Sequence, residues 1–211
     1  MMPLNDSRFI VFEGLDGAGT TTQAAKLQAY FTRRGTPSFL TNEPTTGPIG
    51  AFIRRILTGQ ERGPDGRTYR PGEQAMGLLF AADRLAHSRL VEEQLARGEH
   101  VVCDRYLFSS MAYQTLDPEI TGEWVIDVNR GCAVPDVTLF IAVPVEVCLS
   151  RVGARGAATS IYETRAHLET IASNYDRLLP MYQERFGGVV RIDGNRGIDE
   201  VHDAVVEALG L

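Results

Sequence analysis

The sequence predicts an α/β fold in which five buried parallel strands form one sheet with helices on both faces. Short apolar runs, such as residues 10–12 and 101–103, alternate with longer segments of helical periodicity. Continuous apolar runs suit strands that are covered on both faces, and connections of ten or more residues suit crossover helices. At 211 residues with 44% apolar content, the chain is sized for a single domain with a water-excluding core.

The strands are expected at residues 9–13, 38–41, 100–104, 137–143 and 189–192. Helices are expected at residues 21–34, 50–57, 73–96, 106–115, 123–129, 145–152, 165–185 and 199–209. The helix at 73–96 has the most regular pattern, because Ala75, Leu78, Leu79, Ala82 and Leu85 recur at spacings of three and four. Residues 59–72 and 153–160 are rich in glycine and polar residues, and both are long enough to be mobile loops.

Composition and charge exclude several classes of protein. A net charge of -6 argues against a partner that is a nucleic acid or a membrane surface, since binding polyanions needs a dominant basic face. The three cysteines are far apart and include no C-x-x-C pair, so we expect neither a disulfide framework nor a zinc site. The polar residues 1–8 precede too short an apolar run for a signal peptide or a membrane span, and we expect a cytoplasmic protein.

A glycine-rich loop follows the first predicted strand and leads directly into a helix. It consists of Gly14, Leu15, Asp16, Gly17, Ala18, Gly19, Thr20, Thr21 and Thr22. This is the context of the phosphate-binding P-loop, G-x-x-x-x-G-K-[ST], whose glycines let backbone N–H groups turn toward phosphate oxygens at a helix N-terminus. We therefore expect ATP here, with the Thr21 hydroxyl on a magnesium ion that bridges the phosphates.

The lysine of that pattern is absent, because Thr20 stands at its position. Lys26 is the only lysine in the chain. Six residues further along a helix, it is rotated by about 240° and displaced by roughly 9 Å from position 20. An arginine is therefore expected to supply the missing positive charge.

A second group of residues lies where a phosphorylated acceptor is expected to bind. Asp104 and Arg105 follow a strand, so they lie at the carboxyl end of the sheet, where folds of this kind bind ligands. An arginine at this edge can bind a phosphate with two parallel hydrogen bonds. Ser110, Tyr113 and Gln114 then share one face of the following helix and can contact a sugar and a base.

Phe80 and Arg84 are four residues apart on the long helix, which puts a flat ring beside a guanidinium. A base can stack on the ring while its phosphate meets the arginine. Considered alone, Phe80 is typical of a core residue, and Arg84 is typical of a surface charge paired with a carboxylate. Their joint occurrence favours a binding site.

The chain resembles the thymidylate kinase family from end to end, through FEGLDGAG at 12–19, NEP at 42–44, LFAADR at 79–84 and DRYLFSSMAYQ at 104–114. The resemblance implies phosphorylation of dTMP to dTDP by ATP and magnesium, in a homodimer with a five-stranded core and a mobile lid at about residues 151–163. It further implies a role for each matching residue. Asp16 would meet the acceptor's 3′-hydroxyl, Phe80 would stack on thymine, Arg84 and Arg105 would clamp the acceptor phosphate, Tyr113 would crowd the 2′ position, Gln114 would lie near the base, and Asp104 would order magnesium or phosphate.

The chain departs from the family at two positions. Thr20 replaces the family's P-loop lysine, and Asn42 stands where bacterial members commonly have an arginine before Glu43 and Pro44. Arg151 and Arg155 are four apart in the lid region, and Arg165 lies just beyond it. We expect a lid arginine, first of all Arg155, to replace the missing lysine. Such a charge is worth about 10³ to 10⁵ in rate.

No acid–base residue is required, because phosphoryl transfer depends on alignment and on positive charge. The four histidines are expected at the surface or on helices. Two alternatives stay open, namely a nucleotide-binding homologue without catalysis and a kinase that acts on another nucleoside monophosphate or on a nucleoside. Arg84 and Arg105 together favour a phosphorylated acceptor.

Overall fold

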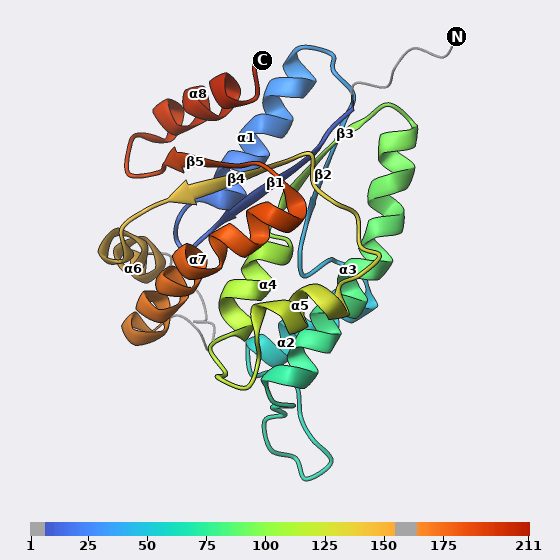
Figure 1. The fold of residues 1–211 in the computed structure, drawn as a ribbon, viewed down its shortest axis with the longest axis vertical. Helices are drawn as coiled ribbons and strands as arrows, with labels where there is room; N and C mark the ends of the chain where they lie inside the picture. Colours follow the sequence, from blue (N-terminus) through green and yellow to red (C-terminus); the bar gives the residue numbers. More distant parts are fainter. Residues whose placement is uncertain (1–6, 155–163) are drawn as a thin grey trace.

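The computed structural model describes residues 7–154 and 164–211, which fold around one sheet of five strands (Figure 1). The strands are β1 (Phe9–Gly14), β2 (Ser38–Asn42), β3 (His100–Asp104), β4 (Val137–Ala142) and β5 (Val189–Asp193). Their order is β2-β3-β1-β4-β5, and every neighbouring pair is parallel. The predicted fold class is confirmed.

The strands differ in burial. Every residue of β1 is buried, whereas β2 and β5 at the two edges are partly exposed, with Leu40 40% exposed. The expectation of five buried strands is therefore wrong at the edges, because an edge strand has a neighbour on one side alone.

Helices cover both faces of the sheet. Their bounds are α1 (Thr20–Arg33), α2 (Pro48–Leu57), α3 (Glu73–Ala96), α4 (Leu107–Gln114), α5 (Gly122–Val128), α6 (Val145–Ala154), α7 (Arg165–Phe186) and α8 (Ile198–Ala208). Helices α1 and α8 pack together on one face, and α3, α4 and α7 lie on the other (Figure 1). No helix in these described segments is long and apolar enough to cross a membrane.

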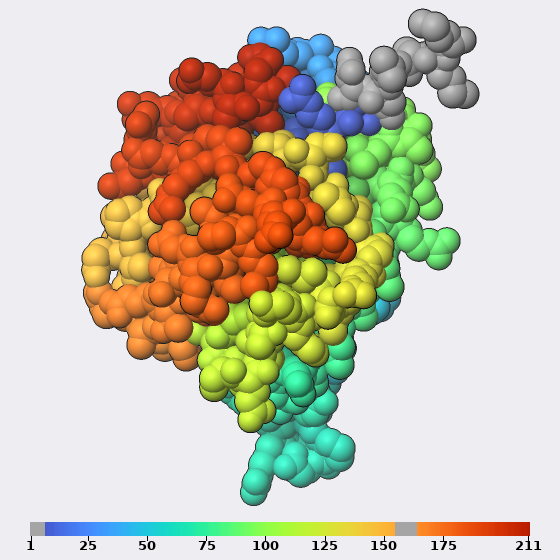
Figure 2. All heavy atoms as spheres, viewed as in Figure 1, coloured from blue at the N-terminus to red at the C-terminus, as the bar shows by residue number. Residues whose placement is uncertain are grey.

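Residues 59–72, expected as a mobile loop, form an arm that projects from the end of the molecule below α2 and α3 (Figure 2). An antiparallel bridge joins Arg62 to Thr68, and the Arg62 guanidinium donates to the Thr68 hydroxyl at 3.1 Å. The Tyr69 ring stacks on Phe52 of α2 with centroids 6.4 Å apart. Backbone and ring contacts thus give this stretch a defined turn.

The register of the central strands places the polar residues of the site. Asp104 of β3 pairs with Phe12 of β1 and with Asn42 of β2. The residues that follow each of these positions, Glu13, Glu43 and Arg105, therefore emerge at one edge of the sheet. This is the carboxyl edge, where parallel α/β folds bind ligands.

Candidate functional site

The P-loop connects β1 to α1 and is closely packed. Gly17 has φ 88°, and a Cβ there would lie 2.5 Å from the Cys148 carbonyl oxygen of α6, so glycine alone fits this position. Within the described residues, no side chain caps the N-terminus of α1, whose first residues are Thr20, Thr21 and Thr22. The N–H groups of this first turn, with the helix dipole behind them, can bind an anion.

Thr21 and Asp104 form the candidate magnesium site. The Thr21 hydroxyl donates to Asp104 Oδ2, and the buried Oδ1 has no hydrogen-bond partner among the residues described. A hydroxyl and a carboxylate are the hard oxygen ligands that Mg²⁺ prefers beside nucleotide phosphates. The residues present therefore fit the ion.

Thr20 brings no positive charge to the loop, and its side chain is buried. Lys26 does not replace it, because its Nζ lies 2.7 Å from Asp199 Oδ1 on α8. The structure thus agrees with the helical spacing that separates Lys26 from the loop.

Arg151 is the predicted lid arginine that the structure describes. Its guanidinium donates to the carbonyls of Ala18 in the P-loop, at 3.4 Å, and of Gly194 after β5, at 3.2 Å. Arg155, and with it most of the predicted lid, lies outside the described residues, while 151–154 form the last turn of α6. Arg165 is paired with Glu146 at the surface.

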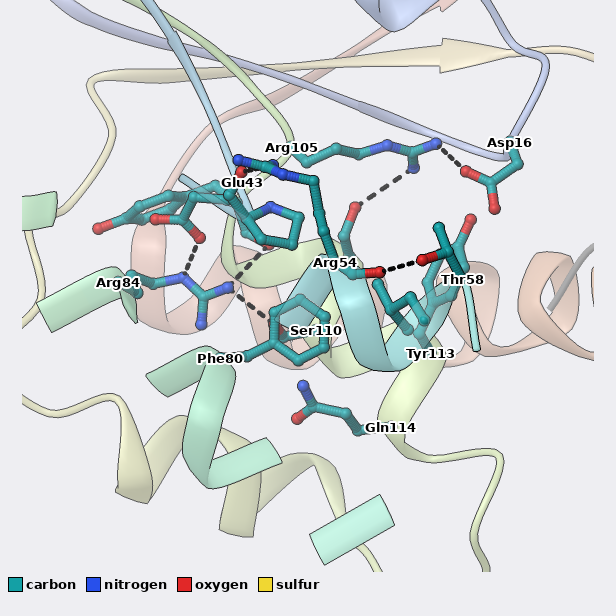
Figure 3. Close-up of a pocket in the computed structure, with 14 residues that line it drawn as sticks. Asp16, Glu43, Arg54, Thr58, Phe80, Arg84, Arg105, Ser110, Tyr113 and Gln114 are labelled. Atoms are coloured by element: carbon teal, nitrogen blue, oxygen red, sulfur yellow. Dashed lines mark hydrogen bonds and ion pairs between the residues drawn. The ribbon is translucent and has the colours of Figure 1, made fainter. Parts of the chain in front are cut away.

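Beside the P-loop is a cavity of about 280 Å³. All seven residues predicted to bind the acceptor line it, from the P-loop, α3 and the β3–α4 segment: Asp16, Phe80, Arg84, Arg105, Ser110, Tyr113 and Gln114. Arg105 and Asp16 lie along one side of the cavity, with Phe80 and Gln114 on the opposite side (Figure 3). The residues that were grouped from the sequence therefore line a single cavity, although the role of each residue stays a prediction.

Arg105 is held at several points. Its backbone has φ 71°, the only positive φ of a non-glycine residue in the part of the chain that is described. Its Nη2 donates to Asp16 Oδ1 at 2.8 Å, and its Nη1 donates to the Gly14 carbonyl. The guanidinium also lies over the Tyr113 ring, 5.8 Å from its centroid. These contacts fix a cation between the P-loop and the cavity.

Arg84 is 1% exposed, so its interpretation as a surface charge is wrong. Its Nε lies 2.8 Å from Glu43 Oε2, and its terminal nitrogens donate to Asn129 Oδ1 at 2.6 Å and to the Ser110 hydroxyl at 2.8 Å. Burial acts to lower the pKa of Arg84, but the Glu43 charge and smaller contributions from neighbouring ionisable groups together outweigh burial, and the pKa is raised. The guanidinium is therefore charged and already has a carboxylate partner.

Glu43 belongs to a network that the site prediction missed. Its Oε1 lies 3.0 Å from His87 Nδ1, and His87 Nε2 lies 2.8 Å from the Thr41 hydroxyl. His87 lies on helix α3, which is one of the two positions expected for the histidines, and its side chain is buried. The available signal was the position of Glu43, which follows β2 as Arg105 follows β3.

Arg54 of α2 also lines the cavity and was missed. It donates to the carbonyls of Pro44 and Thr45 and forms no ion pair with a carboxylate of the described residues. Within its helix it reads as an ordinary surface cation, and no spacing in the sequence singles it out.

A parallel α/β sheet with a phosphate loop after β1 and a cationic cavity beside that loop defines a P-loop nucleotide-binding protein. Comparison with known proteins narrows this class, since the thymidylate kinase family model matches residues 12–205. The chain belongs to the thymidylate kinase family.

Two relatives and one solved structure show the extent of the match. The probable thymidylate kinase of Thermococcus onnurineus is 36% identical over 201 residues, covering 94% of this chain and 95% of that protein. The probable thymidylate kinase of Methanococcus aeolicus is 33% identical over 205 residues, covering 96% of each chain. The structure of thymidylate kinase from Candida albicans superimposes with a TM-score of 0.78 at 24% identity, covering 97% of this chain and 91% of that one, and supports the fold alone.

Proposed function

We propose that this protein transfers the γ-phosphoryl group of ATP to dTMP, giving dTDP. The observation that carries the proposal is the position of Asp16, which belongs to the P-loop and also lines the acceptor cavity, where it pairs with Arg105. Donor and acceptor phosphates bound at these two places approach each other over the carboxyl edge of the sheet. Such alignment removes much of the entropic barrier to transfer.

Different residues of the cavity contact the phosphate, the sugar and the base of the acceptor. Arg105 meets the acceptor phosphate, Asp16 the 3′-hydroxyl, and Tyr113 the 2′ side of the sugar. Phe80 stacks on the base, while Ser110 and Gln114 offer hydrogen bonds to its edge. The Gln114 amide is buried and has no hydrogen-bond partner among the described residues, so it is available to a base.

Arg84 was predicted as a second phosphate clamp, but its partners favour a role at the base end. A guanidinium whose charge is balanced by Glu43 and whose nitrogens already donate to Asn129 and Ser110 has little left for a dianion. Arg54 has no such carboxylate partner in the described chain and is the better candidate for the second phosphate cation. It would also compensate for Asn42, which replaces the family's arginine.

Thr21 and Asp104 would hold magnesium, which supplies positive charge to the donor phosphates when it is bound. The chain's own contribution is to bind both nucleotides, to exclude water and to keep Arg105 aimed at the acceptor phosphate. No general base is needed, since the acceptor phosphate is already nucleophilic at neutral pH.

Arg151 is proposed to supply the charge that Thr20 lacks. It is the described lid arginine whose guanidinium contacts the P-loop, whereas the guanidinium of Arg165 pairs with Glu146. We expect Arg151→Ala to lower kcat by about 10³ or more, while the matched control Arg165→Ala keeps nearly full activity. Equal turnover in both variants would reject this assignment and leave Arg155 as the remaining candidate.

The function is tested by measuring ADP release with dTMP, dUMP, dCMP, AMP and GMP as acceptors. Fastest turnover with dTMP supports the proposal. Preference for another monophosphate makes the protein a kinase of that nucleotide. Nucleotide binding without turnover on any of the five identifies a homologue that has lost catalysis.

A homodimer is proposed on the exposed face of α3, where Leu78 and Leu85 are 53% and 50% exposed. Two large apolar side chains, seven residues apart on one helix, form a stripe that a second copy can cover. Sedimentation velocity should give a dimer for the parent and a monomer for Leu85→Glu. A parent that sediments as a monomer at micromolar concentration refutes the dimer.

The cytoplasmic location stays a prediction.

A further inference from the structure

Glu13 is a fully buried carboxylate at the end of β1, and it makes contacts that neither nucleotide site requires. Its Oε1 accepts hydrogen bonds from the backbone N–H groups of Tyr106, at 3.0 Å, and of Ser109, at 3.1 Å. Its Oε2 accepts from the Ser109 hydroxyl and from the Tyr175 hydroxyl at 3.4 Å. Glu13 therefore ties β1 to the start of α4 and to α7.

These contacts take the place of a helix cap. Helix α4 begins at Leu107, and Tyr106 at its N-cap position provides no side-chain hydrogen bond. A capping side chain normally accepts from the N–H two or three residues into the helix, and a capping-box carboxylate accepts from the N-cap N–H. Oε1 of Glu13 does both, from a strand more than ninety residues away in sequence.

Arg105 lies directly before this capped turn, in the unfavourable left-handed conformation. Its N–H donates to the Phe12 carbonyl at 2.9 Å, and the next N–H, of Tyr106, donates to Glu13. The backbone of Arg105 is thus held on both sides by consecutive residues of β1. A strained conformation of this kind persists when its surroundings enforce it.

The same cluster also reaches the guanidinium. The Tyr175 hydroxyl oxygen also lies 3.1 Å from the Gly14 carbonyl oxygen and 2.9 Å from Ser109 Oγ. Arg105 Nη1 lies 3.3 Å from Ser109 Oγ and 3.4 Å from the Tyr175 hydroxyl. Burial raises the pKa of Glu13, and the Ser109 hydrogen bonds and the Arg105 charge oppose that shift.

We propose that Glu13, together with Tyr175, is a positioning residue that sets the aim of Arg105 at the acceptor phosphate. Neither Glu13 nor Tyr175 lines the cavity, whereas Arg105 and Ser109 do, so the two act through the arginine and not by touching the substrate. The inference rests on the proposed function, since it takes a monophosphate as the ligand of Arg105.

The test compares two ligands that differ by the phosphate alone. Binding of dTMP and of thymidine to the full chain is measured by calorimetry for the parent and for Glu13→Gln, at a temperature where circular dichroism shows both folded. We expect Kd for dTMP to rise about tenfold or more, as for a weakened charge-assisted hydrogen bond. Kd for thymidine should change less than about twofold, because thymidine has no group for Arg105.

A purely structural role for Glu13 predicts another pattern, in which both ligands lose affinity together or neither does. Either outcome overturns the proposal. Tyr175→Phe is the second variant and keeps the test decisive if Glu13→Gln does not fold. It removes one hydroxyl, and it should also weaken dTMP binding selectively.

Action through Arg105 is tested by a double-mutant cycle. In an Arg105→Ala background, Glu13→Gln should have no further effect on the ratio of the two affinities. Additive effects overturn the proposal. A parent that binds no dTMP contradicts the proposed function itself, whereas a parent that binds dTMP with unshifted variants contradicts this inference alone.

Discussion

The buried ion pair between Arg84 and Glu43 makes a large stability effect predictable. Glu43→Gln keeps the shape of the side chain but leaves Arg84, which is 1% exposed, without its charge partner. Removing one member of a buried pair costs about 3–5 kcal/mol. Because Arg84 retains hydrogen bonds to Asn129 and Ser110, we expect the lower end, about 3 kcal/mol, or roughly 6–12 °C in Tm for a chain of this size.

The assay is thermal unfolding followed by circular dichroism, with Asp176→Asn as the matched control. Asp176 pairs with Arg191 at 3.1 Å, but both side chains are mostly exposed, so its loss should cost about 0–1 kcal/mol. A double variant, Glu43→Leu with Arg84→Met, should regain most of the stability while binding dTMP poorly, since apolar replacements remove the uncompensated charge. If Glu43→Gln loses no more stability than Asp176→Asn, the reasoning about Arg84 is refuted.

Three further predictions follow from single residues. Burial and the positive charge of Lys26 lower the pKa of His202 from 6.5, so the unfolded chain takes up the proton first and the free energy of unfolding should fall as the pH drops below about 6.5. Urea unfolding at pH 7.5 and 5.5 should show a smaller decrease in this free energy for His202→Gln than for the parent. An equal decrease in the two proteins contradicts the prediction. Gly17→Ala should abolish ATP binding in a filter assay, because its Cβ would lie 2.5 Å from the Cys148 carbonyl oxygen. The control Gly35→Ala, with a similar φ but open space around it, should bind ATP normally. Normal ATP binding by both variants contradicts the packing argument. Gly77→Ala should lower Tm and weaken dTMP binding, because its Cβ would lie 2.8 Å from the Trp124 ring and 3.0 Å from Gln114 Oε1. In an ordinary helix the same change would stabilise the protein by about 1 kcal/mol. A raised Tm therefore contradicts the prediction.

The parts of the fold that depend on local sequence were predictable. The apolar run of β1, the glycines after it and the periodicity of α3 each identify an element without reference to the rest of the chain. The cavity could be predicted because the carboxyl ends of parallel strands share one edge, which brings Asp16 and Arg105 together. Exposure of β2 and β5 could not be predicted, because it depends on the order of strands in the sheet.

Burial of charged side chains was the main feature that the sequence concealed. Arg84, Glu43 and His87 each resemble surface residues in their own segment, and they become buried because Glu43, directly after β2, meets α3 more than forty residues further along the chain. Glu13 was hidden for the same reason, since its partners lie on α4 and α7. Pairings across such distances leave no periodic signal in the sequence.

The single lysine has a chemical consequence. In the usual P-loop pattern a lysine amine contacts the phosphates, so acylation of that amine removes a positive charge from the nucleotide site. Here the only side-chain amine is Lys26, which faces Asp199 on α8 and lies apart from both nucleotide sites. Acetylating or carbamylating reagents would therefore leave the phosphate contacts charged, whereas a dicarbonyl that modifies guanidinium groups would reach them.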